Sequence, residues 1–549
     1  MGITITGLAS GMDTETMVEE LMQAQREYKV DPLEKKIQLY EWEQEAYQSI
    51  NSTMANFIID TKDNLGLVKT STSGTSYNQT ADDFTWVKTA ESSTTSVATA
   101  TATTTTPNGT YDITVNQLAD NVSAMSGATI TTGTSGTLED QFGLAADVSF
   151  TLETKEGSQT FTFSYNTDTI DEVVDEINDA NIGLTAYYDE DLDRFFLSTD
   201  STGSENYFKI TADGDNFLTN TLGLQIDSDH DGTLDGSVAV DTQYSGQDLS
   251  YDFEGLTGLT SSSNTVTVND ITMTVTDVGS TQITVDTDID AVYEKIEEFI
   301  TAYNSMIDEI NSVLDENKDY DYEPLTDAEK EDMTEDEIEL WEEKAKSGII
   351  ADDTTLSGMA SDMRIAMYES VTGVGVTLSG IGIETSSYSE KGKLHIDETE
   401  LREAIEDDPQ AIMDLFFQEP SDAVNEDDDE LTTAEQEQKY EESGLVYRVY
   451  NIMTEGMKDI IDIAGPGDDE DLLRDVKSDM LVDYVTGVNV STAGVSYLEA
   501  RIEEYEEDVE WQEELLETIE ERYWSKFTAM ESAISEMNST SSWLSSYFA

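Results

Sequence analysis

Helical heptad patterns at both ends of the chain enclose a long middle segment that has the patterns of β-strands. Apolar residues are spaced alternately by four and three from Leu33 to Ile58, and again from Leu498 to Tyr523. This spacing places one apolar stripe along each helix and is typical of a coiled-coil seam. We therefore expect a multidomain α+β protein whose terminal helices form coiled-coil or bundle legs, with antiparallel β-rich domains inserted between them.

Both seams contain irregularities, and a third helix accompanies them. Gln44 and Asn51 are polar residues at seam positions of the first helix. In the last helix the phase of the pattern slips after Tyr523, which indicates a stutter. A further amphipathic pattern from Val292 to Leu314 predicts a helix directly after the β-rich segment.

The outer tails carry apolar groups that a free tail leaves exposed. We expect the Asp13 carboxylate to cap a first helix, which carries Met17 and Leu21. For the inner parts of the seams, an ordinary intramolecular bundle is the alternative explanation. If each tail is free in the monomer, its apolar groups need a partner chain. The candidate contacts with other subunits or a filament are Met17, Leu21, Leu33, Ile37, Tyr40, Tyr47, Met54, Leu516, Ile519, Tyr523, Phe527, Met530, Ile534 and Leu544.

The middle of the chain alternates apolar and polar residues over short segments. An Asn-Gly turn at Asn108 and Gly109 precedes one such segment. Strand patterns at 84–118 and 264–286 flank a separate block at 148–226, so one domain inserted into another is the simplest account. The predicted domains are terminal helical tails at 1–40 and 510–549, disordered in the monomer, a helical leg domain at 41–75 and 290–509, an inner β domain at 76–135 and 237–289, and an inserted variable β domain at 136–236.

Four other segments receive simple predictions from their composition. They are a polar linker at 71–80, an acidic helix at 327–346, an amphipathic helix at 401–417, and an acidic loop or solvated helix at 422–441.

The strong negative charge of the chain excludes several classes of partner. Among 549 residues, 118 are acidic and 27 basic, which gives a formal net charge of −91. Such a surface repels phosphate backbones and anionic lipids, so we expect no nucleic-acid and no membrane partner. Identical subunits this acidic need screening to pack together, which favours a saline habitat. The alternative is that the acidic side chains only keep an exposed protein soluble.

Cysteine chemistry and a cleaved leader are not expected. The chain has no cysteine, which excludes disulfides and cysteine-based metal sites. No apolar run approaches the ~18 residues of a membrane span. The first residues lack the basic and apolar regions of a secretory signal, so we expect that any export follows another route.

One acidic loop has the ligand spacing of a calcium site. Oxygen ligands at alternate positions, with Gly232 at the sixth, suit a calcium loop. Val238 stands where a bidentate Glu is expected, and Asp241 is the nearest substitute. Because acidic clusters arise easily in this chain, a solvated turn is the alternative. The candidate ligands are Asp227, Asp229, Asp231, Thr233 and Asp235.

No pattern of catalytic residues stands out. The two histidines, His230 and His395, are far apart in the sequence and lie near no recognisable nucleophile motif. No Gly-x-Ser-x-Gly elbow, His-Glu-x-x-His helix or Gly-Lys-Ser/Thr phosphate loop occurs. We therefore predict that the protein is not an enzyme and requires no cofactor, calcium being the one candidate ion.

Several short motifs in a fixed order resemble those of the flagellar filament cap family, also called hook-associated protein 2. Each motif is weak alone, and their order and spacing make the resemblance specific. It spans the chain except for the β block around 120–245. The motifs are Gly7–Asp13, Val18–Met22, Asn108–Ala119, Tyr322–Thr326, Trp341–Gly348, Gly380–Ile383, Gly392–Asp397 and Leu415–Phe416.

The resemblance implies a role at the tip of the flagellum. Members of this family form a ring-like homo-oligomer whose helical legs plug the open end of the filament. They retain newly exported flagellin and promote its polymerisation there. They leave the cell through the flagellar export channel, and an export chaperone binds their C-terminal region. The resemblance also implies contact with hook-associated junction proteins and, for some members, adhesion to a host surface glycan through the variable β domain.

Three other functions remain alternatives at this point. A filament or hook-junction subunit would form long polymers, whereas a cap forms closed rings. A secreted calcium-dependent adhesin would bind a glycan or host surface only with the cation present. A secreted hydrolase would lose turnover after a single Asp or Glu substitution.

Overall fold

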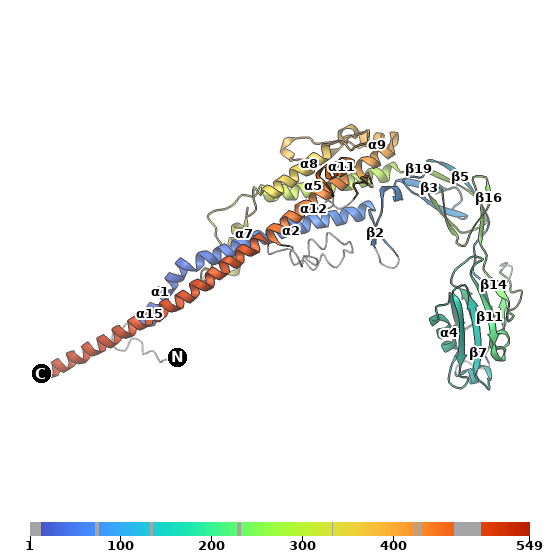
Figure 1. Cartoon of the computed structure of the whole chain (residues 1–549), viewed down its shortest axis with the longest axis horizontal. Coiled ribbons are helices and arrows are strands. Elements are labelled where there is room, and N and C mark those ends of the chain that lie inside the picture. The colour runs from blue at the N-terminus through green and yellow to red at the C-terminus, as the bar shows by residue number, and fades with distance from the viewer. Residues whose placement is uncertain are drawn as a thin grey trace. The chain divides into compact units, whose positions relative to one another are not determined.

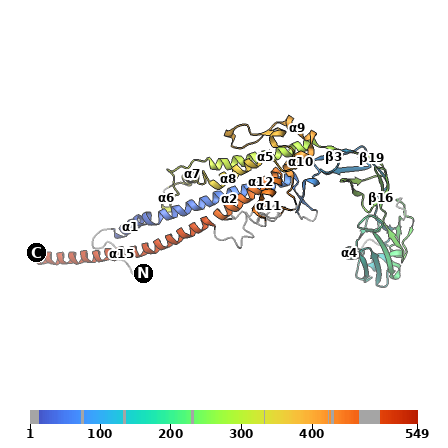
Figure 2. The ribbon, with the colours of Figure 1, turned by 45° about the horizontal axis from the view of Figure 1, so that its top comes forward.

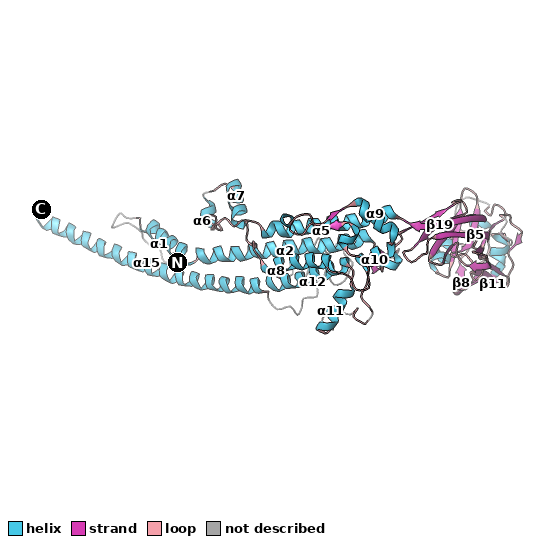
Figure 3. Cartoon of the chain, turned by 90° about the horizontal axis from the view of Figure 1, so that it is seen from above, coloured by secondary structure: helices cyan, strands magenta, loops and turns pink. Residues whose placement is uncertain are grey.

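The computed structural model divides the chain into two compact units. The helical unit combines Met1–Ala81 with Ile289–Ala549, and the β unit is Asp82–Asp288. Figure 3 shows helices dominating the first and strands the second. This confirms the predicted α+β fold, in which terminal helices enclose β-rich structure. The structure describes residues 13–71, 76–131, 136–227, 232–331, 333–421, 423–425, 431–465 and 496–548.

The helical unit is built on long helices from both ends of the chain. In Figures 1 and 2, α2 (Asp31–Leu65) and α15 (Tyr497–Phe548) lie side by side. Other helices pack along α2. The remaining elements are α1 (Thr14–Lys29), β1 (Val68–Thr70), β2 (Ser76–Asn78), α5 (Ile289–Leu314), α6 (Asp327–Glu331), α7 (Glu335–Lys346), α8 (Thr354–Tyr368), η4 (Leu378–Ile381), β20 (Ile383–Glu384), η5 (Tyr388–Glu390), β21 (His395–Ile396), α9 (Glu398–Asp407), α10 (Pro409–Phe417), α11 (Thr433–Glu442) and α12 (Leu445–Ala464).

Local sequence signals explain where these helices begin and end. The Asp13 carboxylate accepts a hydrogen bond from the Thr16 amide at 3.2 Å, which confirms the predicted cap of α1. Pro32 stands in the first turn of α2, where its missing N–H costs nothing. The helix ends at Gly66, whose φ of 78° is the left-handed conformation of a C-terminal cap. The predicted third helix is α5, and its apolar stripe from Val292 to Ile310 is buried.

The β unit contains antiparallel sheets only, among the pairings of the described strands. One five-stranded sheet has the order β16-β15-β5-β19-β3, and beside it is a three-stranded sheet, β17-β18-β4. Another five-stranded sheet, β13-β12-β6-β10-β9, accompanies a four-stranded one, β14-β11-β7-β8. The first half of the unit comprises η1 (Ala81–Asp83), β3 (Lys88–Ser92), β4 (Ala98–Ala102), β5 (Gly109–Gln117), β6 (Ser123–Ser126), α3 (Leu138–Phe142), β7 (Val148–Thr154), β8 (Gly157–Phe163), α4 (Ile170–Asp179) and β9 (Leu184–Asp189). The second half comprises β10 (Arg194–Thr199), β11 (Tyr207–Asp213), η2 (Gly214–Asn216), η3 (Phe217–Thr221), β12 (Leu224–Ile226), β13 (Gly236–Ser237), β14 (Gln243–Ser245), β15 (Leu249–Phe253), β16 (Leu256–Ser261), β17 (Thr265–Val268), β18 (Ile271–Val275) and β19 (Gly279–Thr287).

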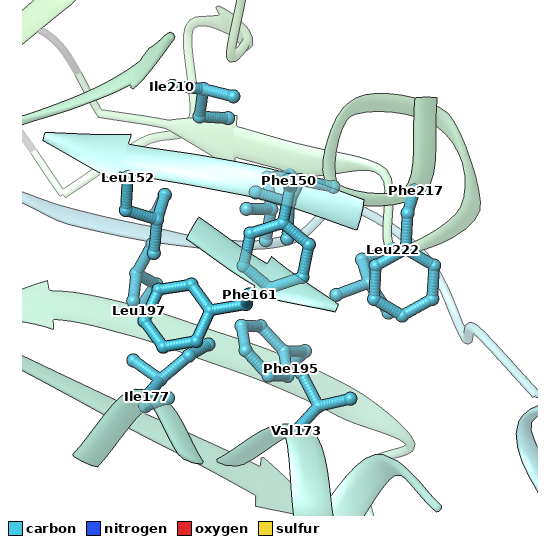
Figure 4. Packing of buried hydrophobic residues seen from close by; sticks show 14 of the residues in the cluster. Phe150, Leu152, Phe161, Val173, Ile177, Phe195, Leu197, Ile210, Phe217 and Leu222 are labelled. Atoms are coloured by element: carbon cyan, nitrogen blue, oxygen red, sulfur yellow. The ribbon is translucent and has the colours of Figure 1, made fainter. Parts of the chain in front are cut away.

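Two separate hydrophobic cores hold the β unit together. The first joins strands on both sides of the middle block, for example Ile113 and Ile283. The second lies inside that block, where Phe150, Phe161 and Phe195 point toward one another (Figure 4). A domain inserted into another has a hydrophobic core of its own, so two separate cores in the β unit agree with the predicted insertion. Val122, Ala124 and Val238 pack in the second core although they lie outside the predicted range 136–236, and the predicted domain boundaries stay a prediction.

Two predicted single helices are each divided in the structure. The segment 401–417 lies in α9 and α10, because Pro409 has no amide hydrogen and Asp408 caps α10 by accepting from the Ala411 amide at 3.1 Å. The segment 327–346 lies in α6 and α7. There Thr334 forms a capping box with Glu337, which starts a new helix.

The other composition-based predictions had mixed outcomes. The predicted linker at 71–80 includes β2, which pairs with β1, so this part is a small hairpin. Within 422–441, the described part contains α11, which has no buried residue and is therefore a solvated helix. In the part of the chain that the structure describes, no helix combines the length and apolarity that crossing a bilayer requires.

Candidate functional site

The terminal helices α1, α2 and α15 bring the two ends of the chain together. Val30 separates α1 from α2 and is fully buried. Pro32, in the first turn of α2, has no amide hydrogen to donate to α1. Within α1, only Thr14 and Val18 are buried. Few buried groups mean a low local stability. We infer that α1 is held mainly at its two ends and can separate from α15 at small cost.

Arg26 joins all three helices through its guanidinium. Its Nη1 lies 3.0 Å from Oε1 of Glu513 in α15, and its Nε lies 3.7 Å from Asp31. Its Nη2 also pairs with Glu34 in α2. One cation therefore pairs with carboxylates from both α2 and α15. The three groups are partly exposed, so each pair contributes at most about 1 kcal/mol.

An aromatic and cationic cluster continues this contact along the seam. The rings of Tyr40 in α2 and Tyr505 in α15 stack with their centroids 5.8 Å apart. Lys36 lies over the Tyr505 ring at 5.0 Å, and the Arg501 guanidinium lies over the same ring at 5.1 Å. Together with the pair between Arg26 and Glu513, this stacking shows that α2 and α15 run antiparallel. The Arg501 guanidinium also lies 6.0 Å from the Tyr40 ring, so in this seam with few basic residues one cation contacts a ring from each helix.

The two polar interruptions in the first seam have different environments. The Gln44 side chain donates to the Ala464 carbonyl at 2.7 Å, and Gln48 donates to the same oxygen at 3.1 Å. These bonds satisfy a carbonyl at the end of α12, which has no partner within its own helix. Asn51 is buried, and neither its side-chain oxygen nor its nitrogen has a hydrogen-bond partner.

Acidic groups crowd the same helices. Burial raises the pKa of Glu41, and the neighbouring carboxylates Glu45 and Glu506 raise this pKa further. Burial also raises the pKa of Glu43 and of Glu34, with Arg26 opposing the shift at Glu34. Deprotonated carboxylates therefore weaken the contact between α2 and α15 at neutral pH, and salt or added cations relieve the repulsion between them.

The predicted contact residues fall into three classes of exposure. Tyr47, Met54 and Leu516 are buried in the helical unit, and the Tyr47 hydroxyl donates to Asp353 at 2.8 Å. For these three, the intramolecular bundle explains the apolar pattern. Met17, Leu21 and Leu544 are exposed. The half-buried members are Leu33, Ile37, Tyr40, Ile519, Tyr523, Phe527, Met530 and Ile534.

The last turns of α15 carry apolar side chains into solvent. In Figures 1 and 2 the end of α15 extends past α1 and α2. Met537 is 71% exposed, Trp543 is 63% exposed and Leu544 is 44% exposed. Met537 and Leu544 are seven residues apart and therefore lie on the same face of the helix. Large apolar groups that gather in solvent mark an interaction surface. The described parts of both tails, 13–40 and 510–548, are mostly helical, and the predicted disorder of the tails in the isolated monomer stays a prediction.

The predicted calcium loop connects β12 to β13 and is only partly described. Asp229 and Asp231 lie outside the described residues. The Gly232 amide donates to the Asp227 carboxylate at 2.6 Å, and Gly232 has a φ of 88°, which fits the sharp turn. No group of three or more metal-ligating side chains occurs among the described residues.

The residues at the twelfth position of this loop and just beyond it have other roles. Val238 is buried, and the Asp241 carboxylate pairs with Lys209 at 3.3 Å. Thr233 and Asp235 lie in the described end of the loop, where the Asp235 amide donates to the Ile226 carbonyl at 2.7 Å. Calcium binding stays a prediction.

Sequence patterns overlooked the basic residues of the site. Arg26, Lys36 and Arg501 hold the helices together, yet none lies on an apolar stripe. One signal was available. In a chain with only 27 basic residues, those in the terminal helices are expected to occupy specific contacts with acidic or aromatic groups.

Known proteins resemble this chain over its whole length. The family models for the flagellar hook-associated protein 2 N-terminus and C-terminus match residues 10–122 and 246–539. Flagellar hook-associated protein 2 of Halalkalibacterium halodurans is 29% identical over 578 residues, covering 99% of each chain. The protein of the same name from Thermotoga maritima is 28% identical over 278 residues, covering 48% of this chain and 40% of its own.

Among solved structures, the D1-D2-D3 domains of the flagellar cap protein FliD from Escherichia coli are similar with a TM-score of 0.47 and 19% identity. That match covers 75% of this chain and 96% of the other. Since the C-terminal family model alone matches more than half of the residues, the chain belongs to the flagellar hook-associated protein 2 family.

Proposed function

We propose that this chain is the distal cap of the bacterial flagellar filament. It acts as a ring of identical subunits that retains exported flagellin and promotes its polymerisation at the tip. The observation that carries the proposal is the match of the family across both ends of the chain. The proposal assigns the chain a structural role outside the cell and no enzymatic activity.

The terminal helices are the part of the chain that engages the filament. Their apolar groups at Met537, Trp543 and Leu544 need a neighbouring molecule to leave water. Because α1 buries little of its surface, docking can reorder this region. Ordering costs conformational entropy, so the contact stays weak enough to rearrange as each flagellin adds.

Family membership supports a set of partners for the proposed cap. They are flagellin below the ring, the hook-associated junction proteins, and an export chaperone before secretion. A host surface glycan is a further partner if the variable β domain serves adhesion. We propose no contact with nucleic acid or membrane, because a net charge of −91 repels both.

Removing the exposed apolar side chains at the end of α15 tests this function. In a deletion strain, the triple variant Met537→Ser, Trp543→Ser, Leu544→Ser should leave cells non-motile and shed unpolymerised flagellin into the medium. Its melting temperature should match that of the unmodified protein, because these side chains contact water.

Two exposed leucines elsewhere provide the matched control. Leu192 in the β unit is 58% exposed and Leu340 in α7 is 60% exposed, so Leu192→Ser with Leu340→Ser also removes exposed apolar surface, away from the end of α15. This control should restore swimming. Normal motility with the triple variant, or normal motility in the deletion strain itself, would contradict the proposal.

A further inference from the structure

Six threonines form a regular array on the outer face of one sheet in the β unit. In the sheet β17-β18-β4, Thr265 lies opposite Thr274, which lies opposite Thr99. A second row consists of Thr267, Thr272 and Thr101. All are exposed except Thr272, which is half-buried. The Thr267 and Thr272 hydroxyls hydrogen bond across the strands at 2.9 Å.

The threonine array carries no charge, although 26% of the chain is charged. No strand of the sheet contains an acidic or basic residue, and the segments 92–111 and 255–269 are also free of charge. A second threonine ladder on β7 and β8 differs. There Thr151 and Thr160 share a face with Glu153, and Lys209 lies opposite Glu153 on β11. Pairing of threonines across strands therefore does not require a charge-free face.

Copies of this chain repel each other over most of their surface. Each carries a net charge of −91, and like charges brought together at a contact disfavour association. The repulsion between two copies is smallest where the surface lacks carboxylates. We propose that the threonine array is a contact surface between copies of this chain in the cap.

The chemistry of threonine suits such a contact. Each hydroxyl both donates and accepts, so identical or different polar surfaces can satisfy it. The branched side chain has little rotamer freedom and loses little entropy on ordering. The opposite face of the sheet fixes the strands, because Val266, Ile271 and Met273 are buried in the core beneath them.

The contact extends beyond the six threonines. A stable interface buries about 800 Å² on each partner, which exceeds what three short strands offer. The charge-free chain continues from β17 back into β16, an edge strand whose Leu256 is 61% exposed. An uncharged, exposed edge strand is itself a site for association. The array and this edge strand are thus joined by a segment of chain without charge.

This inference rests on the proposed cap function, and paired charge substitutions test it. The assay is the mass of the assembled protein by sedimentation, in sodium chloride at a concentration where the unmodified chain associates. Thr267→Lys and Thr267→Glu should each weaken association by about tenfold or more, because either charge is left unpaired in the contact. If only net charge mattered, the glutamate would weaken association and the lysine would strengthen it.

Thr160 is the matched control, since it is exposed, lies on the outer strand β8 and hydrogen bonds Thr151 across the strands at 2.8 Å. Thr160→Lys and Thr160→Glu should leave assembly within about twofold of the unmodified chain. Equal assembly by the Thr267 and Thr160 variants overturns the inference. Circular dichroism and the melting temperature identify a variant that misfolds. Thr267→Ser keeps the hydroxyl and should assemble normally.

A labelling experiment gives a second readout that does not depend on a charge. Because the chain has no cysteine, Thr101→Cys and Thr162→Cys each introduce a unique thiol at an exposed position. Maleimide should react more slowly with Thr101→Cys in the assembled state than in the dissociated state, and equally in both states with Thr162→Cys. If Thr101→Cys reacts at the same rate in the assembled and dissociated states, as Thr162→Cys does, the threonine contact is overturned and the cap function is not. A chain that stays monomeric at every salt concentration and fails to cap filaments overturns the cap function with it.

Discussion

The Arg26 guanidinium at the end of α1 lies 3.0 Å from the Glu513 carboxylate in α15, although 487 residues separate the two. The same guanidinium pairs with Glu34 and lies 3.7 Å from Asp31. In a chain this acidic, one basic residue therefore holds the first helix to the last. This pair therefore contributes to how easily α1 separates from α15.

Reversing the charge at Arg26 should loosen α1. Arg26→Glu places a fourth carboxylate among three, and exposed pairs contribute up to about 1 kcal/mol. We expect the amides of Thr14–Lys29 to exchange with deuterium up to about fivefold faster, measured by mass spectrometry. Lys155→Glu, which breaks an exposed pair with Glu205 in the β unit, should leave α1 unchanged. Unaltered exchange in α1 of the Arg26 variant would show that other contacts hold it.

Much of the fold follows from the sequence because periodicity reports burial directly. The stripe from Val292 to Ile310 faces the core in α5 as its spacing requires. Breaks within helices were harder to predict. Pro409 and the capping box at Thr334 are clear local signals, but the acidic residues around them extend the helical pattern and hide the boundary.

The contact residues could be predicted only in part. Spacing identifies the apolar stripe of α2 and α15, but it does not tell which segment meets its own chain and which meets a partner. Met54 is buried and Leu544 is exposed on stripes of the same kind. The difference arises because α15 continues past α1 and α2, the helices that cover it. The sequence pattern of one helix does not show how far its partner helices extend.

Arg448 should be essential for the stability of the helical unit. Its buried guanidinium donates to the carbonyls of Glu369, Ser370, Tyr440 and Glu441, at the ends of α8 and α11, at 2.9–3.1 Å. Arg448→Met leaves these acceptors without their donor, which costs on the order of 3 kcal/mol or more. We expect a lower melting temperature by calorimetry.

The control for Arg448 is Arg402 in α9, whose guanidinium pairs with Glu398 and Asp290 at a partly exposed site. Arg402→Met should lower the melting temperature much less than Arg448→Met, because solvent screens an exposed ion pair. Equal effects of the two variants would mean that the buried position of Arg448 adds nothing to its contacts.

Adjacent phenylalanines on β10 should differ strongly in their contribution to the β unit. Phe195 is fully buried in the second core, whereas Phe196 lies on the opposite face with its ring 6.2 Å from that of the exposed Tyr187. Phe195→Ala should destabilise the unit by about 3–5 kcal/mol through the cavity that it leaves. Phe196→Ala should cost about 1 kcal/mol or less. Calorimetric unfolding of both variants checks this, and a reversed order would contradict the strand register.

Neutralising Glu43 should stabilise the helical unit at neutral pH. Burial raises the pKa of this carboxyl on α2 above its ordinary value. The folded state therefore binds the proton more tightly than the unfolded state, and stability is lost as the pH rises through the folded pKa. Glu43→Gln removes that loss, so its melting temperature should exceed that of the unmodified protein at pH 7 and equal it near pH 4. Because solvent screens a partly exposed group, the gain is below about 1 kcal/mol. Glu20→Gln, at an exposed position in α1, is the control and should change the melting temperature little at pH 7. A gain for Glu43→Gln that is as large at pH 4 as at pH 7 would show that packing of the amide, and not the proton, is responsible.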